Sequence, residues 1–252
     1  MKKMRGHAVI WLILIGGGLM TIFYAIQAHA HENTATQSTP SEAQEMAKRE
    51  ANSQRFAFLA LLDEVISILR DDNPFNPEKP VFGEIKSTNI GPDGTGYVYR
   101  YKNNAIPSTK EIFTTQADPL DYSEDRTKVR AVPSYFHLYF FDSITGINRT
   151  EMEERLDLAD FRPGPHGEKV EGNCYPAPPP AISVLICRYR ANERINSRYP
   201  VNVEFVFNEP SKDNPHVEPS LASVTIERVY PVFGPEKRKQ QREEENQRAR
   251  HR

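Results

Sequence analysis

Apolar side chains recur at helical spacing in the segment between residues 56 and 70. They stand three or four positions apart, while the polar residues Asp63, Glu64 and Ser67 fall on the opposite face. This pattern is typical of an amphipathic helix that buries one face in a core. The stripe covers less than two heptads, so a coiled-coil surface is the weaker interpretation. Its apolar members are Phe58, Leu61, Leu62, Val65, Ile66 and Leu69.

The same helix is expected to begin well before its apolar stripe. Thr39 has the chemistry of an N-cap, Pro40 suits the first helical position and Glu42 completes a capping box. The helix is expected to stop before Pro74, since proline cannot continue it. Ahead of the stripe the apolar residues are small or scattered, which predicts a solvated surface. We therefore interpret residues 31–55 as a linker followed by the polar half of this helix.

The remainder of the chain shows strand patterns separated by proline and glycine. In the clearest alternation, Val201, Val203 and Phe205 are separated by polar residues, the period of a half-buried strand. The connections are too short for helical crossovers, so neighbouring strands are expected to pair antiparallel. The segments with strand patterns are 81–90, 97–101, 110–115, 134–141, 181–190, 201–207 and 221–230.

A second, shorter helix is expected after the aromatic strand at 134–141. Thr150 is placed as its N-cap, with Glu153 closing the capping box. The elements together predict an α+β fold: one long N-terminal helix and one short helix packed on a mainly antiparallel sheet of four to six strands. Residues 56–233 are interpreted as a single α+β domain. Residues 234–252 are interpreted as a disordered charged tail, because they carry almost nothing to bury.

The first thirty residues predict export from the cytoplasm. Three basic residues precede an uncharged run at 8–26, and Ala28-His29-Ala30 fits a small-x-small cleavage site. Two interpretations stay open for residues 1–30, a cleaved signal peptide or a single transmembrane anchor through residues 8–26. Both place the rest of the chain on the other side of the membrane. The expected location is the cell envelope, on the periplasmic side of the inner membrane, either anchored or soluble after cleavage.

Cysteine usage agrees with an exported domain. Only Cys174 and Cys187 occur, and an even count in an oxidising compartment predicts one intramolecular disulfide. Metal ligation is the alternative, but two cysteines alone rarely hold zinc and no CxxC pair exists. Closing a loop of this size is expected to stabilise the fold by ~3 kcal/mol.

The distribution of charge excludes one class of partner. The formal net charge of −2 hides a basic leader, a basic tail and an acidic middle, because residues 31–235 hold 22 basic and 30 acidic residues. A surface for nucleic acid needs concentrated lysine and arginine, so no nucleic-acid partner is expected. The hydrophobic share of 38% is too high for a fully disordered chain, and 252 residues suit one or two domains.

Four arginines form a local exception in the acidic domain. Arg188, Arg190, Arg194 and Arg198 follow one another at the end of a predicted strand and in the loop after it. On a strand Arg188 and Arg190 share one face, and Cys187 takes the other. Guanidinium groups bind carboxylates and phosphates in a bidentate manner, so these four residues are the candidate binding site for an acidic partner. The alternative is that they pair with the domain's own acids.

Motifs for catalysis or cofactors are absent from the sequence. It contains no HExxH, no GxSxG, no dinucleotide-binding GxGxxG and no histidines at metal-ligand spacing. His137 alternates with Tyr135 and Tyr139 and is expected on a sheet face, while His166 lies in a loop, where functional residues are common. No catalytic residue, metal or cofactor is assigned, and a non-catalytic role is favoured over an enzymatic one.

These observations favour an exported or membrane-anchored envelope protein whose α+β domain binds another macromolecule. A protein partner is expected, either in an inhibitor or immunity-like pair or in an envelope assembly. One alternative is a periplasmic hydrolase whose polar residues converge without a motif. A second is a pilin-like subunit, because the layout of basic leader, apolar helix and late disulfide is similar to that of pilins. The acidic residue expected five positions after Gly6 is replaced by Trp11, and Pro40 interrupts the helix.

Overall fold

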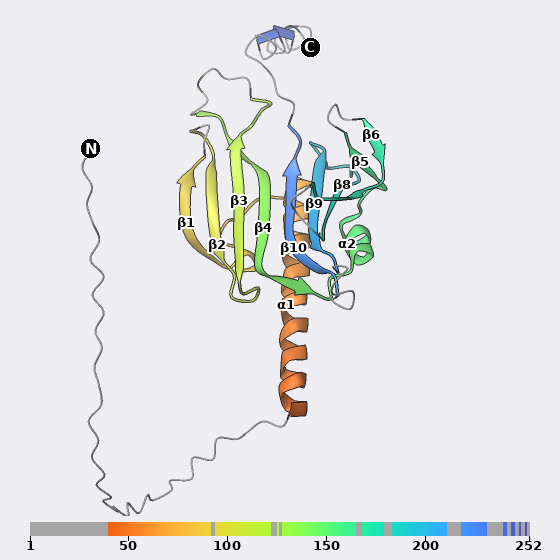
Figure 1. The fold of residues 1–252 in the computed structure, drawn as a ribbon. Helices are drawn as coiled ribbons and strands as arrows, with labels where there is room; N and C mark the ends of the chain where they lie inside the picture. Colours follow the sequence, from red (N-terminus) through yellow and green to blue (C-terminus); the bar gives the residue numbers. More distant parts are fainter. Residues whose placement is uncertain are drawn as a thin grey trace, which may run out of the picture. The chain divides into compact units, whose positions relative to one another are not determined.

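The structure, a computed structural model, describes residues 40–91, 94–121, 125, 128–164, 168–178, 183–210 and 218–230, with 239–240, 243–244, 247 and 250 in the tail. Two helices lie against a large antiparallel sheet, which confirms the α+β class (Figure 1). The elements are α1 (Pro40–Leu69), the 3-10 helix η1 (Pro80–Phe82), β1 (Glu84–Ile90), β2 (Tyr97–Lys102), β3 (Thr109–Ala117), β4 (Ala131–Thr145), α2 (Arg149–Leu156), β5 (Phe161–Pro163), β6 (Lys169–Glu171), β7 (Cys174–Pro176), β8 (Val184–Arg190), β9 (Val201–Asn208) and β10 (Ser220–Arg228).

The main sheet contains eight strands in the order β1-β2-β3-β4-β10-β9-β8-β7, and every neighbouring pair is antiparallel. The prediction of antiparallel pairing is confirmed, but the predicted four to six strands are too few. Two physical reasons account for the difference. The pairing of β4 with β10 joins the strands before and after α2 into one sheet, which local patterns do not reveal. The edge strand β7 is only three residues long and has no alternation to detect.

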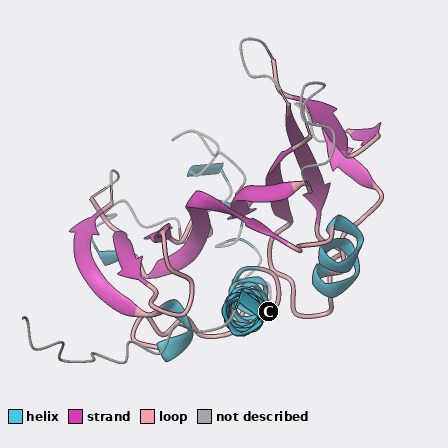
Figure 2. Cartoon of the chain, turned by 60° about the horizontal axis from the view of Figure 1, so that its bottom comes forward, coloured by secondary structure: helices cyan, strands magenta, loops and turns pink. Residues whose placement is uncertain are grey.

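The apolar stripe of α1 packs on one face of this sheet, which we call the inner face. Phe58, Leu61 and Leu62 have no exposed surface, and the ring of Phe58 meets that of Phe140 on β4 edge to face at 5.6 Å. Figure 2 looks nearly along α1 and shows that α1 and α2 lie on the same side of the sheet. Met152 and Leu156 of α2 belong to the same buried cluster. The core-facing helix predicted from the stripe is therefore confirmed.

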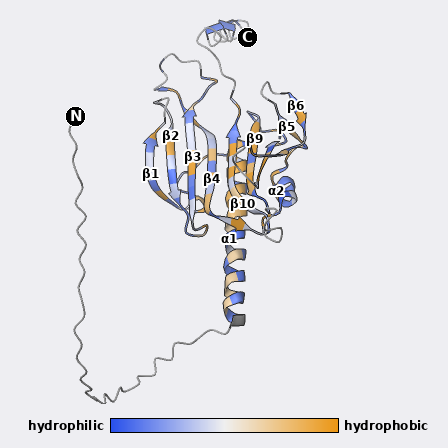
Figure 3. Ribbon diagram, viewed as in Figure 1, coloured by the Kyte–Doolittle hydropathy of each residue, from blue (hydrophilic) through white to orange (hydrophobic). Residues whose placement is uncertain are grey.

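The first half of α1 is solvated, as its polar composition predicts. Residues 42–53 are all exposed, and this part of the helix extends beyond the sheet, where hydrophilic positions recur along it (Figure 3). The helix begins at Pro40 as expected, while the proposed cap Thr39 lies outside the described residues. Residues 1–30, expected as a signal or anchor, also lie outside them. In the part of the chain that is described, no helix is long and apolar enough to cross a bilayer.

A buried arginine from β10 closes the C-terminal end of α1. Arg228 donates from Nε to the carbonyl of Leu69 at 2.6 Å, and from Nη2 to the carbonyl of Ile68 and to Asp72, both at 2.7 Å. The last carbonyls of a helix have no partner within the helix, and they carry partial negative charge. Arg228, only 6% exposed, therefore satisfies these carbonyls and fixes α1 to the sheet.

Two other local predictions have different outcomes. The N-cap of α2 is Asn148, whose side-chain oxygen accepts from the backbone N–H of Thr150 at 2.9 Å. The prediction of Thr150 as the cap is wrong. Asparagine and threonine are both good N-cap residues, so residue type alone does not show at which of the two positions the helix begins. The predicted disulfide is confirmed, since Cys174 and Cys187 are bonded across the paired strands β7 and β8.

Candidate functional site

The face of the sheet opposite α1, which we call the outer face, carries aligned rows of polar side chains. On β8, Cys187 and Tyr189 are buried in the core while Arg188 and Arg190 point to the outer face, as strand alternation predicts. Cross-strand pairing then defines two rows that run over β8, β9, β10 and β4. The first row is Arg188, Glu204, Thr225 and His137, and the second is Arg190, Asn202, Glu227 and Tyr135.

The small hairpin β5–β6 turns this end of the outer face into a groove. Leu158, just before β5, bridges to Ala191, and the N–H of Ala159 donates to the carbonyl of Arg190 at 2.8 Å. The hairpin therefore lies beside β8. Together they enclose a groove of about 980 Å³, which we call the arginine groove. The polar residues that line it include Arg162, Arg188, Arg190, Asn202, Glu204 and Glu227.

The three guanidinium groups of the arginine groove have different surroundings. Arg188 donates from Nε to Glu204, and this hydrogen bond raises the pKa of Arg188. Arg190 forms no ion pair with any described residue, and desolvation lowers its pKa although Glu193 acts in the opposite direction. Arg162 lies over the ring of Tyr175 at 4.9 Å. Arg190 is thus a half-buried cation that no described acidic side chain contacts directly, although the charge of Glu193 acts on it.

Two buried atoms in the groove also lack hydrogen-bond partners among the described residues. Arg162 Nε, a donor, and Asn202 Oδ1, an acceptor, are both shielded from solvent, and neither forms a hydrogen bond. Most buried polar atoms in folded proteins are paired, so each exception calls for an explanation. A ligand in the groove that offers an acceptor to Arg162 and a donor to Asn202 supplies one.

The structure divides the four arginines predicted as one binding site. Arg188 and Arg190 line the groove, but Arg194 and Arg198 lie in the loop beyond β8 near the end of α1. Arg194 pairs with Asp157 at 3.4 Å and Asp71 at 3.8 Å. Arg198 pairs with Asp72 at 3.7 Å and Asp118 at 3.8 Å. These two arginines, like Arg188 with Glu204, therefore take part in the internal pairing that was the alternative interpretation.

Sequence reasoning missed Arg162, Asn202 and Glu227. Arg162 lies in a three-residue strand that has no detectable pattern, and only the packing of β5 on β8 brings it to the groove. The alternation along β9 predicts that Asn202 faces away from the core, but not that it opposes Arg190. His166 lies outside the described residues.

His137 lies next to the groove in the first polar row. Its Nδ1 is 3.0 Å from the hydroxyl oxygen of Thr225, and its ring stacks on Tyr135 with centroids 6.2 Å apart. Burial, assisted by Lys110, lowers the pKa of His137 and so favours the neutral imidazole. It therefore lies on a sheet face as predicted. Among the described residues no group of three or more histidine, cysteine, aspartate or glutamate side chains is placed to hold a metal ion.

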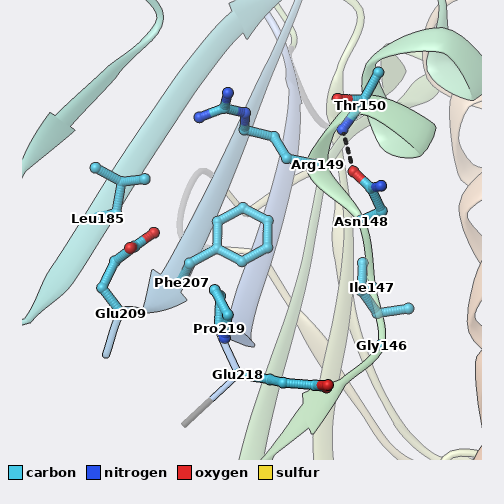
Figure 4. Close-up of a pocket in the computed structure, with 10 residues that line it drawn as sticks. All are labelled: Gly146, Ile147, Asn148, Arg149, Thr150, Leu185, Phe207, Glu209, Glu218 and Pro219. Carbon is cyan, nitrogen blue, oxygen red and sulfur yellow. Dashed lines mark hydrogen bonds between the residues drawn. The ribbon is translucent and has the colours of Figure 1, made fainter. Parts of the chain in front are cut away.

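A second cavity of about 440 Å³ lies between the start of α2 and the ends of β8 and β9 (Figure 4). Leu185 and Phe207 line it, with Glu209 and Glu218 at the same end. Asn148, which also lines it, already uses its side-chain oxygen in the cap of α2. None of the described residues lining this cavity has a buried polar atom without a partner. The arginine groove is therefore the stronger candidate site.

Comparison with known proteins found no matching protein family, no matching curated protein and no matching solved structure.

Proposed function

We propose that this is an exported or membrane-anchored envelope protein whose α+β domain binds another protein through the arginine groove, without catalysing a reaction. The observation that carries the proposal is the cluster formed by Arg190, a half-buried guanidinium without an ion pair among the described residues, and the buried, unpartnered atoms Arg162 Nε and Asn202 Oδ1 in the same groove. Taking a charge out of water costs free energy unless an opposite charge replaces the lost hydration. A carboxylate on a partner does so with charge-assisted hydrogen bonds in bidentate geometry. In the complex, Arg190 then forms the ion pair that it lacks among the described residues of the free domain.

The proposed location rests on the sequence. A basic leader, an uncharged run at 8–26 and a small-residue cleavage site support transfer of the domain out of the cytoplasm. The disulfide between Cys174 and Cys187 agrees with an oxidising compartment. In that compartment the domain acts as an inhibitor or immunity-like partner or as a component of an envelope assembly.

Affinity capture with matched variants tests this proposal. The full-length protein, tagged at its C-terminus, is expressed in its native host and recovered with its bound proteins for mass spectrometry. In the groove variant, Arg162→Gln is combined with Arg190→Gln. In the control, Lys48→Gln is combined with Arg49→Gln on the exposed part of α1, where the surface pair of Arg49 with Glu45 contributes little. Both variants lose the same charge.

The native protein and the control are expected to retain a specific partner that the groove variant loses. An equal yield of that partner from all three proteins refutes binding through the groove. Recovery of no specific protein by the native chain refutes the binding function itself. Far-UV circular dichroism of each variant checks that the fold is retained.

A further inference from the structure

The arginine groove contains both a positively charged and a negatively charged side chain without an ion pair among the described residues. Glu227 is exposed and forms no ion pair among the described residues, although its charge contributes to the raised pKa of Arg188. It stands in the same cross-strand row as Arg190, with Asn202 between them. Neighbouring strands are spaced by about 4.8 Å, so backbones two strands apart are separated by about 10 Å. That span leaves room for ligand groups between Arg190 and Glu227. A ligand lying across the strands therefore meets a cation, then an acceptor, then an anion.

We infer that the arginine groove selects a peptide segment of mixed charge and rejects polyanions. This inference rests on the proposed function and adds the chemistry of the partner. Acidic side chains of the segment lie against Arg162 and Arg190. A basic side chain lies against Glu227, and an N–H group donates to Asn202 Oδ1. Such a segment satisfies each unpaired group, because a polypeptide carries both charges and regularly spaced donors.

Other anions match the groove less well. A nucleic-acid strand has a phosphate at every nucleotide, and one of these would lie close to the carboxylate of Glu227. Like charges placed opposite each other suppress binding of the wrong partner. Inorganic phosphate can pair with the arginines, but it offers no cation to Glu227 and adds a second negative charge near its carboxylate. The volume of about 980 Å³ is at the upper end of the range for ligand pockets, which suits a short peptide segment.

Apolar side chains complete the match to a peptide. Val170 on β6 and Val229 after β10 line the groove together with the aromatic ring of Tyr135. Interfaces between proteins combine aromatic and arginine side chains in this way, with buried apolar stems surrounding the charged contacts. The aliphatic part of a long acidic or basic side chain can pack on these residues while its charged end pairs.

Fluorescence anisotropy on the full-length protein tests the selection. The labelled probes are a peptide of alternating glutamate and lysine, a polyglutamate peptide of the same length and a short oligothymidylate, with inorganic phosphate as an unlabelled competitor. The alternating peptide is expected to bind at least about tenfold more tightly than polyglutamate or oligothymidylate. Arg162→Gln with Arg190→Gln is expected to abolish this binding.

A change at the acidic end of the groove sharpens the test. Glu227→Gln removes the repulsion, so the preference for the alternating peptide over polyglutamate is expected to fall by about tenfold. The control Glu45→Gln, on the exposed part of α1, changes the net charge equally and is expected to leave the preference intact. An unchanged preference in Glu227→Gln, or polyglutamate binding as tightly as the alternating peptide to the native protein, overturns the inference.

The outcomes separate this inference from the proposed function. If polyglutamate binds as tightly as the mixed peptide but loses binding in the arginine variant, the groove binds acidic partners and only the selection is refuted. If the arginine variant binds every probe as the native protein does, both proposals fail.

Discussion

Glu111 is predicted to make this fold less stable as the pH rises. It lies on β3, only 1% exposed, with its side chain on the inner face of the sheet, and neither carboxylate oxygen has a hydrogen-bond partner. Its cross-strand neighbour Tyr101 has a buried hydroxyl that is also unpaired. Burial raises the pKa of Glu111 to about 9. The side chain of Asn103 opposes this shift, but burial is the larger cause; one N–H of the Asn103 amide donates to the carbonyl of Val81 at 3.0 Å.

The size and sign of the effect follow from proton linkage. In the unfolded chain the Glu111 carboxyl has its ordinary pKa of 4.5, whereas in the folded protein the pKa is about 9. Between these values the folded state binds one more proton than the unfolded state, so the free energy of unfolding falls by ~1.4 kcal/mol per pH unit. The loss reaches roughly 3 kcal/mol at pH 7 and becomes constant above pH 9. Below pH 4.5 Glu111 is protonated in both states, and the full stability is present.

The substitution Glu111→Gln tests this because glutamine has a similar shape and does not ionise. The variant is expected to be more stable than the native protein by roughly 3 kcal/mol near pH 7, and by less than about 1 kcal/mol near pH 5. Urea unfolding followed by circular dichroism, repeated from about pH 5 to about pH 8, measures the free energy of unfolding of both proteins. Glu111→Leu removes the polar group altogether and is expected to show the same loss of pH dependence.

The control is Glu171→Gln on the exposed hairpin strand β6, which is expected to leave the pH dependence unchanged. The reasoning is refuted if the native protein and Glu111→Gln lose stability in parallel between pH 5 and pH 8. That result would mean that the carboxyl is ionised in the folded state, or that it is solvated there.

Three further predictions concern the end of α1, the disulfide and export. Arg228→Leu leaves the carbonyls of Ile68 and Leu69 without their buried donor and removes one of the two arginine partners of Asp72, the other being Arg198. It is expected to cost about 3 kcal/mol of unfolding free energy, measured by urea unfolding with Arg100→Leu on exposed β2 as the control. Replacing Cys174 and Cys187 by serine is expected to cost ~3 kcal/mol, whereas equal stability of oxidised and reduced native protein would contradict this. Protease added to intact spheroplasts of the native host is expected to digest the domain if it is anchored. If residues 1–30 are cleaved, the domain is expected in the released periplasmic fraction, and its retention in the cytoplasm would contradict export.

The local sequence pattern was sufficient to predict those features that are decided by residues close together in the chain. The buried stripe of α1 and the opposite faces of Arg188 and Cys187 follow from side-chain periodicity along a short segment. The antiparallel pairing follows from connections that are too short for helical crossovers. The disulfide also followed, because two cysteines in an oxidising compartment allow only one intramolecular pair. In each case the deciding information lies within a short segment of the chain or, for the disulfide, in the number of cysteines.

The long-range arrangement required the tertiary structure. Whether β4 pairs with β10, and therefore whether there is one sheet of eight strands, depends on register between distant segments. The packing of β5 on β8 brings Arg162 to the groove, although no pattern near Arg162 indicates it. The four arginines separate because the chain leaves the sheet after Arg190, which takes Arg194 and Arg198 to the acids near the end of α1.

The sequence by itself therefore determined the two helices, the longer strands, the covalent link and the face on which Arg188 and Arg190 lie. Only the tertiary structure decided which charges are paired, since ion pairing and desolvation depend on distances between segments far apart in the chain. For this reason Arg190 is the one of the four predicted arginines that has no ion pair among the described residues, whereas Arg188, Arg194 and Arg198 each have at least one.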